Sequence, residues 1–361
     1  MEHGSEFHLM EPVEASDRFV SPWSQNGLLF GTGRDAIKGT LTMGMESMGW
    51  NCLWVPAYFC QGVVESMAET GIRVRSYYSW YPGNSRTTSL PVLKKGDVLF
   101  TVNHFGLLRQ SDPEFAPGRP SAVIEDHSHD PWSLWANNST ADYCVASLRK
   151  TLPIPDGGVA WSPLGRRLPD APPLTEQHRA AAEEKLEAMK LKAQYLSGTL
   201  ADKSRYRTLS VHGEEHLSHQ MPSGALGWTK DHLETFPMAR WRDARRANHE
   251  SLRLRLSTVK WAEVISSGSS PEVVPFSCII VFDTPERREY VRRKLIESDI
   301  YPAILWSLSN PAIPGIPAAH AKASGRMLSV HCDMRYSRND MVHVGDHIER
   351  YGQEFDEYRT F

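Results

Sequence analysis

The sequence predicts an α/β fold in two parts: a large domain with a mostly parallel sheet flanked by helices, and a small C-terminal α+β domain. Three observations predict it. The chain has 361 residues, more than one ordinary domain holds. Nearly continuous apolar strands alternate with helical segments in the first half, which is typical of a parallel sheet covered on both faces. A serine-rich joint at 266–270 precedes a second run of strands and helices, so we expect domains over 11–265 and 266–361.

Composition excludes several classes of protein. A net charge of -3 and a hydrophobic content of 40% give no sign of binding to nucleic acid or to an anionic membrane. No apolar run approaches the roughly 20 residues that span a bilayer. The five cysteines are scattered and odd in number, which indicates buried thiols rather than a disulfide framework and favours a cytoplasmic protein. Residues 1–10 resemble a vector-derived leader, and we exclude them from the expected fold.

The first half of the chain alternates between strand and helix signals. The proline-free segment 35–48 has apolar residues at helical spacing, and Gly71 ends a second helical segment as a left-handed cap would. Strands are expected where short apolar runs stop at proline, glycine or polar residues. The expected elements are strands at 52–56, 72–78 and 96–103, helices at 35–48 and 61–70, and a polar loop at 83–91.

A glycine-containing turn, Gly31-Thr32-Gly33, lies directly before the first expected helix. Backbone amides at a helix start have no intrahelical partner and lie at the positive end of the helix dipole, so such a turn can bind a phosphate group. Glycine also ends strands and caps helices, and the turn alone is therefore a weak signal.

The stretch from Ser121 to Gly158 is the most informative. A strand at 122–126 ends in Asp126, and the next strand, at 141–146, is soon followed by Lys150. Ligands bind at the carboxyl ends of the strands in parallel sheets, so these two side chains should share a site. Pyridoxal phosphate (PLP) needs such a pair: a lysine amine for a Schiff base and a carboxylate on the pyridinium nitrogen.

The second half is expected to be helical before the small domain begins. A proline-rich linker leads to a proline-free segment rich in alanine, glutamate and lysine, which predicts a helix. Residues 212–221 read as an irregular polar stretch. The expected elements are a helix at 175–196, two helices within 223–257, strands at 273–282, 300–306 and 326–332, and helices at 285–298 and 339–351.

In order and spacing, these segments resemble fold-type I PLP-dependent enzymes, in particular the DegT/DnrJ/StrS-type family, which is sugar aminotransferase-like. The resemblance rests on Glu-Asp-His-Ser-His at 125–129, Ser-Leu-Arg-Lys at 147–150 and Asp-Gly-Gly at 156–158. Residues 298–306 and 328–337 resemble the family's C-terminal landmarks, so the likeness covers nearly the whole chain. It departs at one point, because the family usually has two more residues between this serine and this lysine.

The resemblance implies roles for four residues of this stretch. Lys150 would hold PLP as a Schiff base and carry the proton during catalysis. Asp126 would pair with the pyridinium nitrogen, and His129 would lie near the ring hydroxyl. Ser147 would bind the phosphate group.

It also implies roles for residues nearer the amino terminus. The Gly31, Thr32 and Gly33 turn would bind the phosphate, and Tyr58 or Phe59 would cover one face of the cofactor ring. His104 would line the site. Two aromatic rings in the core and an ordinary loop histidine explain the last three residues equally well.

The resemblance implies an aminotransferase that moves an amino group from glutamate or glutamine to a keto acceptor, a keto-sugar nucleotide or a related biosynthetic intermediate. It also implies a homodimer with shared active sites. Residues 212–221, with His216, His219 and Gln220, would then reach the partner's site, unless they form an ordinary surface loop.

Two other functions remain open from the sequence. The same groups could serve a PLP enzyme of another reaction type: elimination, replacement, condensation or dehydration. A metal-dependent hydrolase is the alternative from a different class, with ligands drawn from the histidine-rich segments, namely His104, His127, His129 and Asp130.

Overall fold

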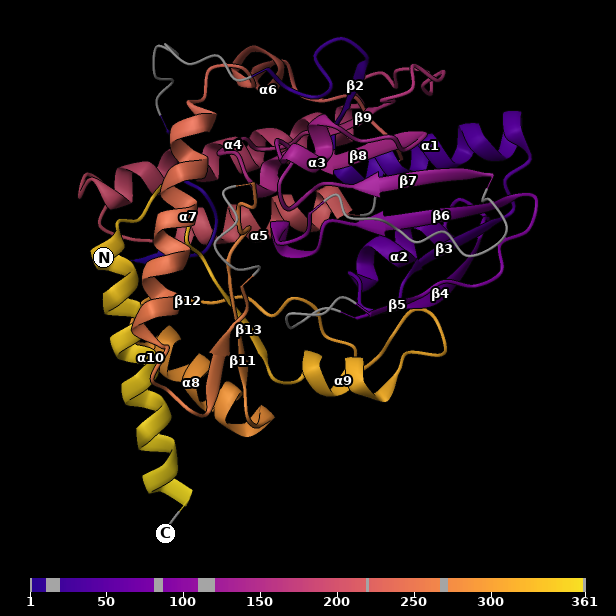
Figure 1. Ribbon diagram of the computed structural model, residues 1–361. Helices are drawn as coiled ribbons and strands as arrows, with labels where there is room; N and C mark the ends of the chain where they lie inside the picture. The colour runs from indigo at the N-terminus through magenta and orange to yellow at the C-terminus, as the bar shows by residue number, and fades with distance from the viewer. Residues whose placement is uncertain are drawn as a thin grey trace.

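The computed structural model describes residues 2–10, 20–80, 87–109, 121–218, 221–266 and 272–359. Figure 1 shows a large sheet with its helices and, beside it, a smaller group of strands flanked by long helices. In the part of the chain that is described, we find no helix long and apolar enough to cross a membrane.

An eight-stranded sheet forms the large domain, in the order β2-β9-β8-β7-β6-β3-β4-β5. The five strands from β8 to β4 are parallel, whereas β9, β2 and β5 pair antiparallel with their neighbours. This confirms the mostly parallel sheet. The bounds are β2 Gly27–Phe30, β3 Cys52–Pro56, β4 Arg73–Trp80, β5 Thr87–Ser89, β6 Asp97–Val102, β7 Ala122–Asp126, β8 Tyr143–Ser147 and β9 Gly158–Trp161.

Both faces of this sheet are buried. One face packs on helix α1 (Gly33–Met48), which buries Ala36, Ile37 and Leu41, and on α2 (Gln61–Ala68). The opposite face is covered by an aromatic core that includes Trp161. Short turns of helix lie between the strands: η1 His104–Gly106, α3 Leu134–Asn137 and η2 Leu148–Lys150.

Two packed helices, α4 (Glu176–Leu196) and α5 (Ser204–Ser218), follow the sheet. The expectation of an irregular stretch at 212–221 was wrong for residues 212–218, because α5 continues through them. Its residues His219 and Gln220 lie outside the described part of the chain. Helices α6 (Gly227–His232) and α7 (Met238–Arg255) come next.

The C-terminal part is built on a three-stranded antiparallel sheet, β10-β11-β13. Helix α7 packs along α10, and the core of this part takes Leu252 and Leu256 from the end of α7, so that helix packs with the small sheet (Figure 1). The expected strand at 300–306 is much shorter in the structure. The bounds are β10 Ala262–Val264, β11 Cys278–Phe282, α8 Pro285–Glu297, β12 Ile300–Tyr301, α9 Ala318–Ser324, β13 Met327–Val330 and α10 Arg338–Arg359.

The excluded amino-terminal residues are part of the fold. Strand β1 (His3–Gly4) pairs parallel with β12, and the Gly4 amide donates to the Tyr336 hydroxyl at 2.7 Å. The ring of His3 stacks on Tyr336 at 3.8 Å. The Lys192 ammonium, on α4, pairs with Glu2 at 3.0 Å, and both side chains are buried. The exclusion of residues 2–10 from the fold was therefore wrong, whatever their origin.

Removal of residues 1–10 should lower the free energy of unfolding by about 2–4 kcal/mol, because it leaves the buried Lys192 ammonium without its carboxylate. Chemical denaturation of the full and shortened chains measures the difference. As a matched control, Lys192→Met in the shortened chain should recover part of the loss. Equal stability of the full and shortened chains would contradict the packing described here.

Candidate functional site

A pocket of about 200 Å³ lies at the carboxyl ends of β7 and β8. Asp126 is the last residue of β7, Ser147 is the last of β8, and Lys150 ends the helical turn η2 directly after it. These three residues all line the pocket. The expectation that the two strand ends share a site therefore agrees with the geometry.

The two strand ends are tied together through Ser128. The Ser128 amide donates to Oδ1 of Asp126 at 2.8 Å, and the Ser128 hydroxyl accepts from the Ser147 amide at 2.8 Å. Asp126 thus has one carboxylate oxygen held by the backbone. This arrangement fixes the direction of the carboxylate relative to β8.

The start of α1 forms another wall of the pocket, with Thr32 and Gly33 lining it. Thr32 caps the helix: its hydroxyl accepts from the Asp35 amide at 3.1 Å, while the Asp35 carboxylate accepts from the Thr32 amide at 3.0 Å. A Cβ on Gly33 would lie 2.8 Å from Cβ of Ser147. Only glycine therefore lets the helix start approach the end of β8 this closely.

The strand β9 comes equally close to the same turn. A Cβ on Gly158 would lie 2.1 Å from the Thr32 carbonyl oxygen, and the Gly157 amide donates to the Gly31 carbonyl at 2.5 Å. Asp156, which precedes these glycines, is buried away from the pocket. It accepts from the Leu226 amide at 2.8 Å and pairs with His178 at 2.9 Å. Its contacts hold α4 and α6 against the site.

Lys150 and His129 are electrostatically coupled. Burial, and after it the positive charge of Lys150, lowers the pKa of His129 well below its usual value. Among the described residues, none forms a hydrogen bond with the Lys150 amine. His129 does not line the pocket: it is buried, its Nδ1 accepts from the Phe105 amide at 2.9 Å, and its ring stacks on Phe276 at 4.6 Å.

The remaining predicted residues separate into two groups. Phe59 lines the pocket, whereas Tyr58, His104 and Gly31 do not. The Tyr58 hydroxyl donates to the Leu305 carbonyl, and burial raises its pKa. His104 shares a hydrogen bond of 2.8 Å with the Tyr58 carbonyl. Gly31 packs on the His178 ring. These three residues support the pocket from behind.

Three charged residues of the pocket wall were absent from the sequence prediction of the site: Arg34, Arg149 and Glu214. Arg149 and Glu214 form a two-pronged ion pair with both N–O distances at 2.6 Å. Burial alone would raise the pKa of the Glu214 carboxyl, but the Arg149 charge, followed by that of Lys185, holds it well below its usual range. Arg149 stands inside the Ser-Leu-Arg-Lys motif and could have been proposed, whereas nothing in the sequence points to Glu214.

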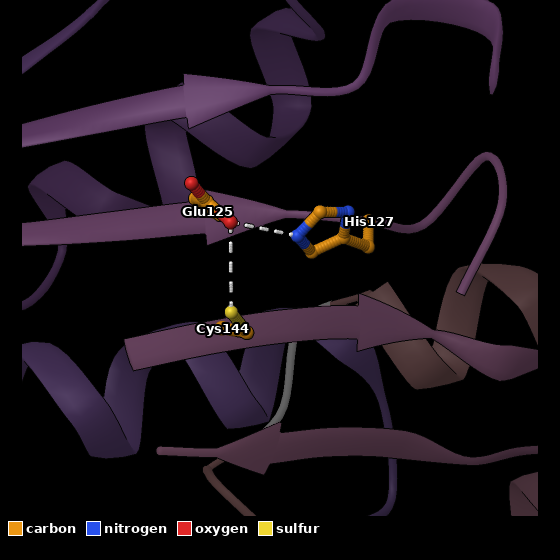
Figure 2. A group of neighbouring side chains, drawn as sticks. All are labelled: Glu125, His127 and Cys144. Carbon is orange, nitrogen blue, oxygen red and sulfur yellow. Dashed lines mark hydrogen bonds and ion pairs between the residues drawn. The ribbon is translucent and has the colours of Figure 1, made fainter. Parts of the chain in front are cut away.

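The metal-binding alternative does not have the expected ligand set. His104 and His129 are held by backbone groups, and Asp130 is paired with Arg242. The structure instead gathers His127 with Glu125 and Cys144, with their ligand atoms within 4.8 Å of one another. Figure 2 shows Glu125 on β7 linked to His127, just past that strand, and to Cys144 on β8.

This Glu125 group lies on the opposite face of the sheet from the pocket, since neighbouring residues of a strand point to opposite faces. The Glu125 carboxylate already accepts from His127 at 3.0 Å and from the Ser139 hydroxyl at 2.7 Å. All three side chains are buried. The Glu125 carboxylate therefore already has two hydrogen-bond donors within the protein.

No family model matches the sequence, and no curated protein matches it. Many solved structures share the fold. One is DesI, described in the presence of its TDP-sugar product, with 13% identity and a TM-score of 0.60 over 92% of this chain and 82% of that one. Another is the PMP form of a putative sugar aminotransferase, Spr1654 from Streptococcus pneumoniae, with 11% identity and a TM-score of 0.61 over 93% and 88%.

A further similar structure is 3-amino-5-hydroxybenzoic acid synthase, with 13% identity and a TM-score of 0.59 over 91% of this chain and 86% of that chain. These likenesses confirm the fold class: the chain shares its fold with these solved structures. Because the sequence identities are low, the activity has to be argued from the residues of the pocket.

Glu214→Gln should cost about 0.5–1 kcal/mol of stability at neutral pH, a modest amount because the Glu214 side chain is 38% exposed and water screens the pair. The pKa of Glu214 is lower in the folded state than in the unfolded state. Its ionised carboxylate therefore stabilises the fold fully above the unfolded-state pKa, and this stabilisation is lost as the pH falls through the folded-state pKa. The wild type should therefore lose more stability than the variant on acidification below about pH 4.5.

Denaturation curves between pH 2 and 7 measure this difference. The exposed neighbour Glu215 on the same helix provides the matched control, and Glu215→Gln should follow the wild type. Parallel curves for Glu214→Gln and the wild type would contradict the ion pair.

Proposed function

We propose that this chain is a PLP-dependent aminotransferase that moves an amino group from an amino acid to a keto acceptor. The observation that carries the proposal is the meeting of Asp126, Ser147 and Lys150 with the start of α1 in one pocket. The fold supports it, because solved structures with this fold include an aminotransferase described in PLP and PMP forms.

The residues of the pocket fit this cofactor. The close approach of Gly33 to Ser147 leaves a helix start and a hydroxyl side by side, which suits a phosphate group. At the other side, the fixed carboxylate of Asp126 suits a protonated ring nitrogen. Lys150 lies in the same pocket with no hydrogen-bonding partner among the described residues. When bound, PLP would supply an electron sink for the substrate's α carbon.

Each residue then has a definite task. The Lys150 amine would bind the cofactor's carbonyl carbon, be released by the amino donor, and then move a proton as a general acid and base. Asp126 would keep a proton on the ring nitrogen by charge. Thr32, Gly33 and Ser147 would bind the phosphate, and Phe59 would cover the ring. His129 would lie behind the ring, where its low pKa keeps it neutral near neutral pH.

Glutamate or glutamine as donor, and a keto-sugar nucleotide or related intermediate as acceptor, remain part of the proposal. The similarity to DesI, whose product is a TDP-sugar, supports such an acceptor. A homodimer and a cytoplasmic location are also proposed. The His216 side chain on α5 is 58% exposed, so it would be accessible to a partner subunit.

A PLP enzyme of another reaction type is the second candidate. It is favoured by the short connection between Ser147 and Lys150, which folds as the single turn η2 and so gives the lysine less chain than the resembled family has. A shorter tether limits the positions that the amine reaches, and proton transfer depends on that reach.

Borohydride reduction of the PLP-treated protein, followed by peptide mass mapping, should place a pyridoxyl group on Lys150. The Lys150→Ala variant should remain unlabelled, whereas Lys38→Ala, which removes a lysine on α1 outside the pocket lining, should be labelled like the wild type. A label on another lysine, or on none, would refute the assignment.

An amino donor alone should convert bound PLP to pyridoxamine phosphate, and a keto acid should restore PLP. In Asp126→Asn, the conversion should slow by about 100-fold or more, because a neutral amide does not hold the ring nitrogen protonated, while PLP uptake should largely persist. Stopped-flow absorbance and chromatography of the released cofactor follow both steps. Absence of pyridoxamine phosphate with every donor tried would favour the second candidate over transamination.

A further inference from the structure

Three charged residues of the pocket have no task in the proposed chemistry: Arg34, Arg149 and Glu214. They come from different elements, namely the first turn of α1, the turn η2 and the helix α5. The other polar residues of the pocket are sufficient to bind the cofactor. The convergence of three further charged residues therefore indicates that the pocket also binds a charged group of a ligand.

The Glu214 carboxylate interacts with three cationic side chains at this side of the pocket. Besides the two-pronged pair with Arg149, it accepts from the Lys185 ammonium at 2.8 Å and lies 3.8 Å from the Arg34 guanidinium. One carboxylate therefore faces three cations, of which Arg34 and Arg149 line the pocket and Lys185 also lies 3.8 Å from Glu6.

Arg149 itself shows an unused donor. The pair with Glu214 employs both terminal nitrogens, while the Nε–H group is buried and has no acceptor among the described residues. A buried donor without an acceptor is costly, and an oxyanion would supply one.

The guanidinium of Arg34 lies close enough to that of Arg149 for their charges to interact. Burial, and after it the charge of Arg149, lowers the pKa of Arg34. Two guanidinium groups held near each other bind carboxylate or phosphate oxygens well, because each presents its donors in a planar fork.

We propose that Arg34 and Arg149 form a subsite that binds an oxyanion of the substrate, a carboxylate or a phosphate group, with Glu214 as the residue that positions Arg149. In this inference the subsite is distinct from the proposed phosphate site at Thr32, Gly33 and Ser147, although all five residues line the same pocket. The inference rests on the proposed function, since it assumes that the cofactor occupies that seat. It assigns the substrate to the acidic or phosphorylated compounds.

Calorimetric titration of the PLP-loaded protein with inorganic phosphate and with succinate, in a chloride buffer, tests the subsite. We expect at least one of the two anions to bind, and Arg34→Gln and Arg149→Gln each to weaken that binding about tenfold or more. The affinity for PLP should change by less than about threefold. Arg167→Gln, which removes a 72% exposed arginine away from the pocket, is the matched control and should behave as the wild type.

Preferential binding of phosphate would identify a phosphorylated substrate, and preferential binding of succinate a carboxylate. Circular dichroism checks that the variants fold, and Arg149→Lys, which keeps the charge but not the fork, should also weaken binding if Arg149→Gln does not fold. The inference is wrong if neither anion binds the PLP-loaded protein, if the variants bind like the wild type, or if they lose PLP affinity instead.

A different result would refute the proposed function, namely the absence of a pyridoxyl group on Lys150 after borohydride reduction. A protein without such labelling that still binds phosphate through Arg34 and Arg149 would refute the aminotransferase and keep the oxyanion subsite.

Discussion

The site depends on one close approach: the start of α1 lies against the ends of β8 and β9. A side chain at Gly33 would collide with Ser147, and one at Gly158 would collide with the Thr32 carbonyl. These contacts place the positive end of a buried helix within the same pocket as Lys150. Because the helix is also capped by Thr32 and Asp35, its first turn is fixed before any ligand arrives.

Much of this arrangement could be predicted from the sequence, because it follows from local rules. Strands that end in Asp126 and Ser147 are parallel neighbours, so their last residues share an edge of the sheet. The first helix was recognisable from its apolar spacing and its glycine-containing start. The boundaries of α1, α4 and α8 agree with the expected ones within a few residues. Helix α5 was not expected, and α10 continues beyond its expected end to Arg359.

The remainder depended on tertiary contacts that carry no local signal. Helix α5 packs on α4, and this packing brings Glu214 to Arg149. Tyr58 and Phe59 are adjacent, chemically similar and both buried, yet Phe59 lines the pocket and Tyr58 does not. The amino-terminal segment is held by Tyr336, a residue more than 330 positions away, so composition alone could not place it.

Strand β7 divides its two acidic residues between separate tasks. Asp126 points into the pocket, where one of its oxygens is held by the Ser128 amide. Glu125 faces the other side of the sheet, where His127 and Ser139 donate to it in a buried network. Burial raises the pKa of Glu125, but the hydrogen bond and charge of His127, together with the hydrogen bond from Ser139, outweigh it and keep that pKa below its usual value. The network thus clamps the residues on both sides of Asp126, and a carboxylate that must hold a proton at a fixed position on a ligand gains from a strand end that does not move.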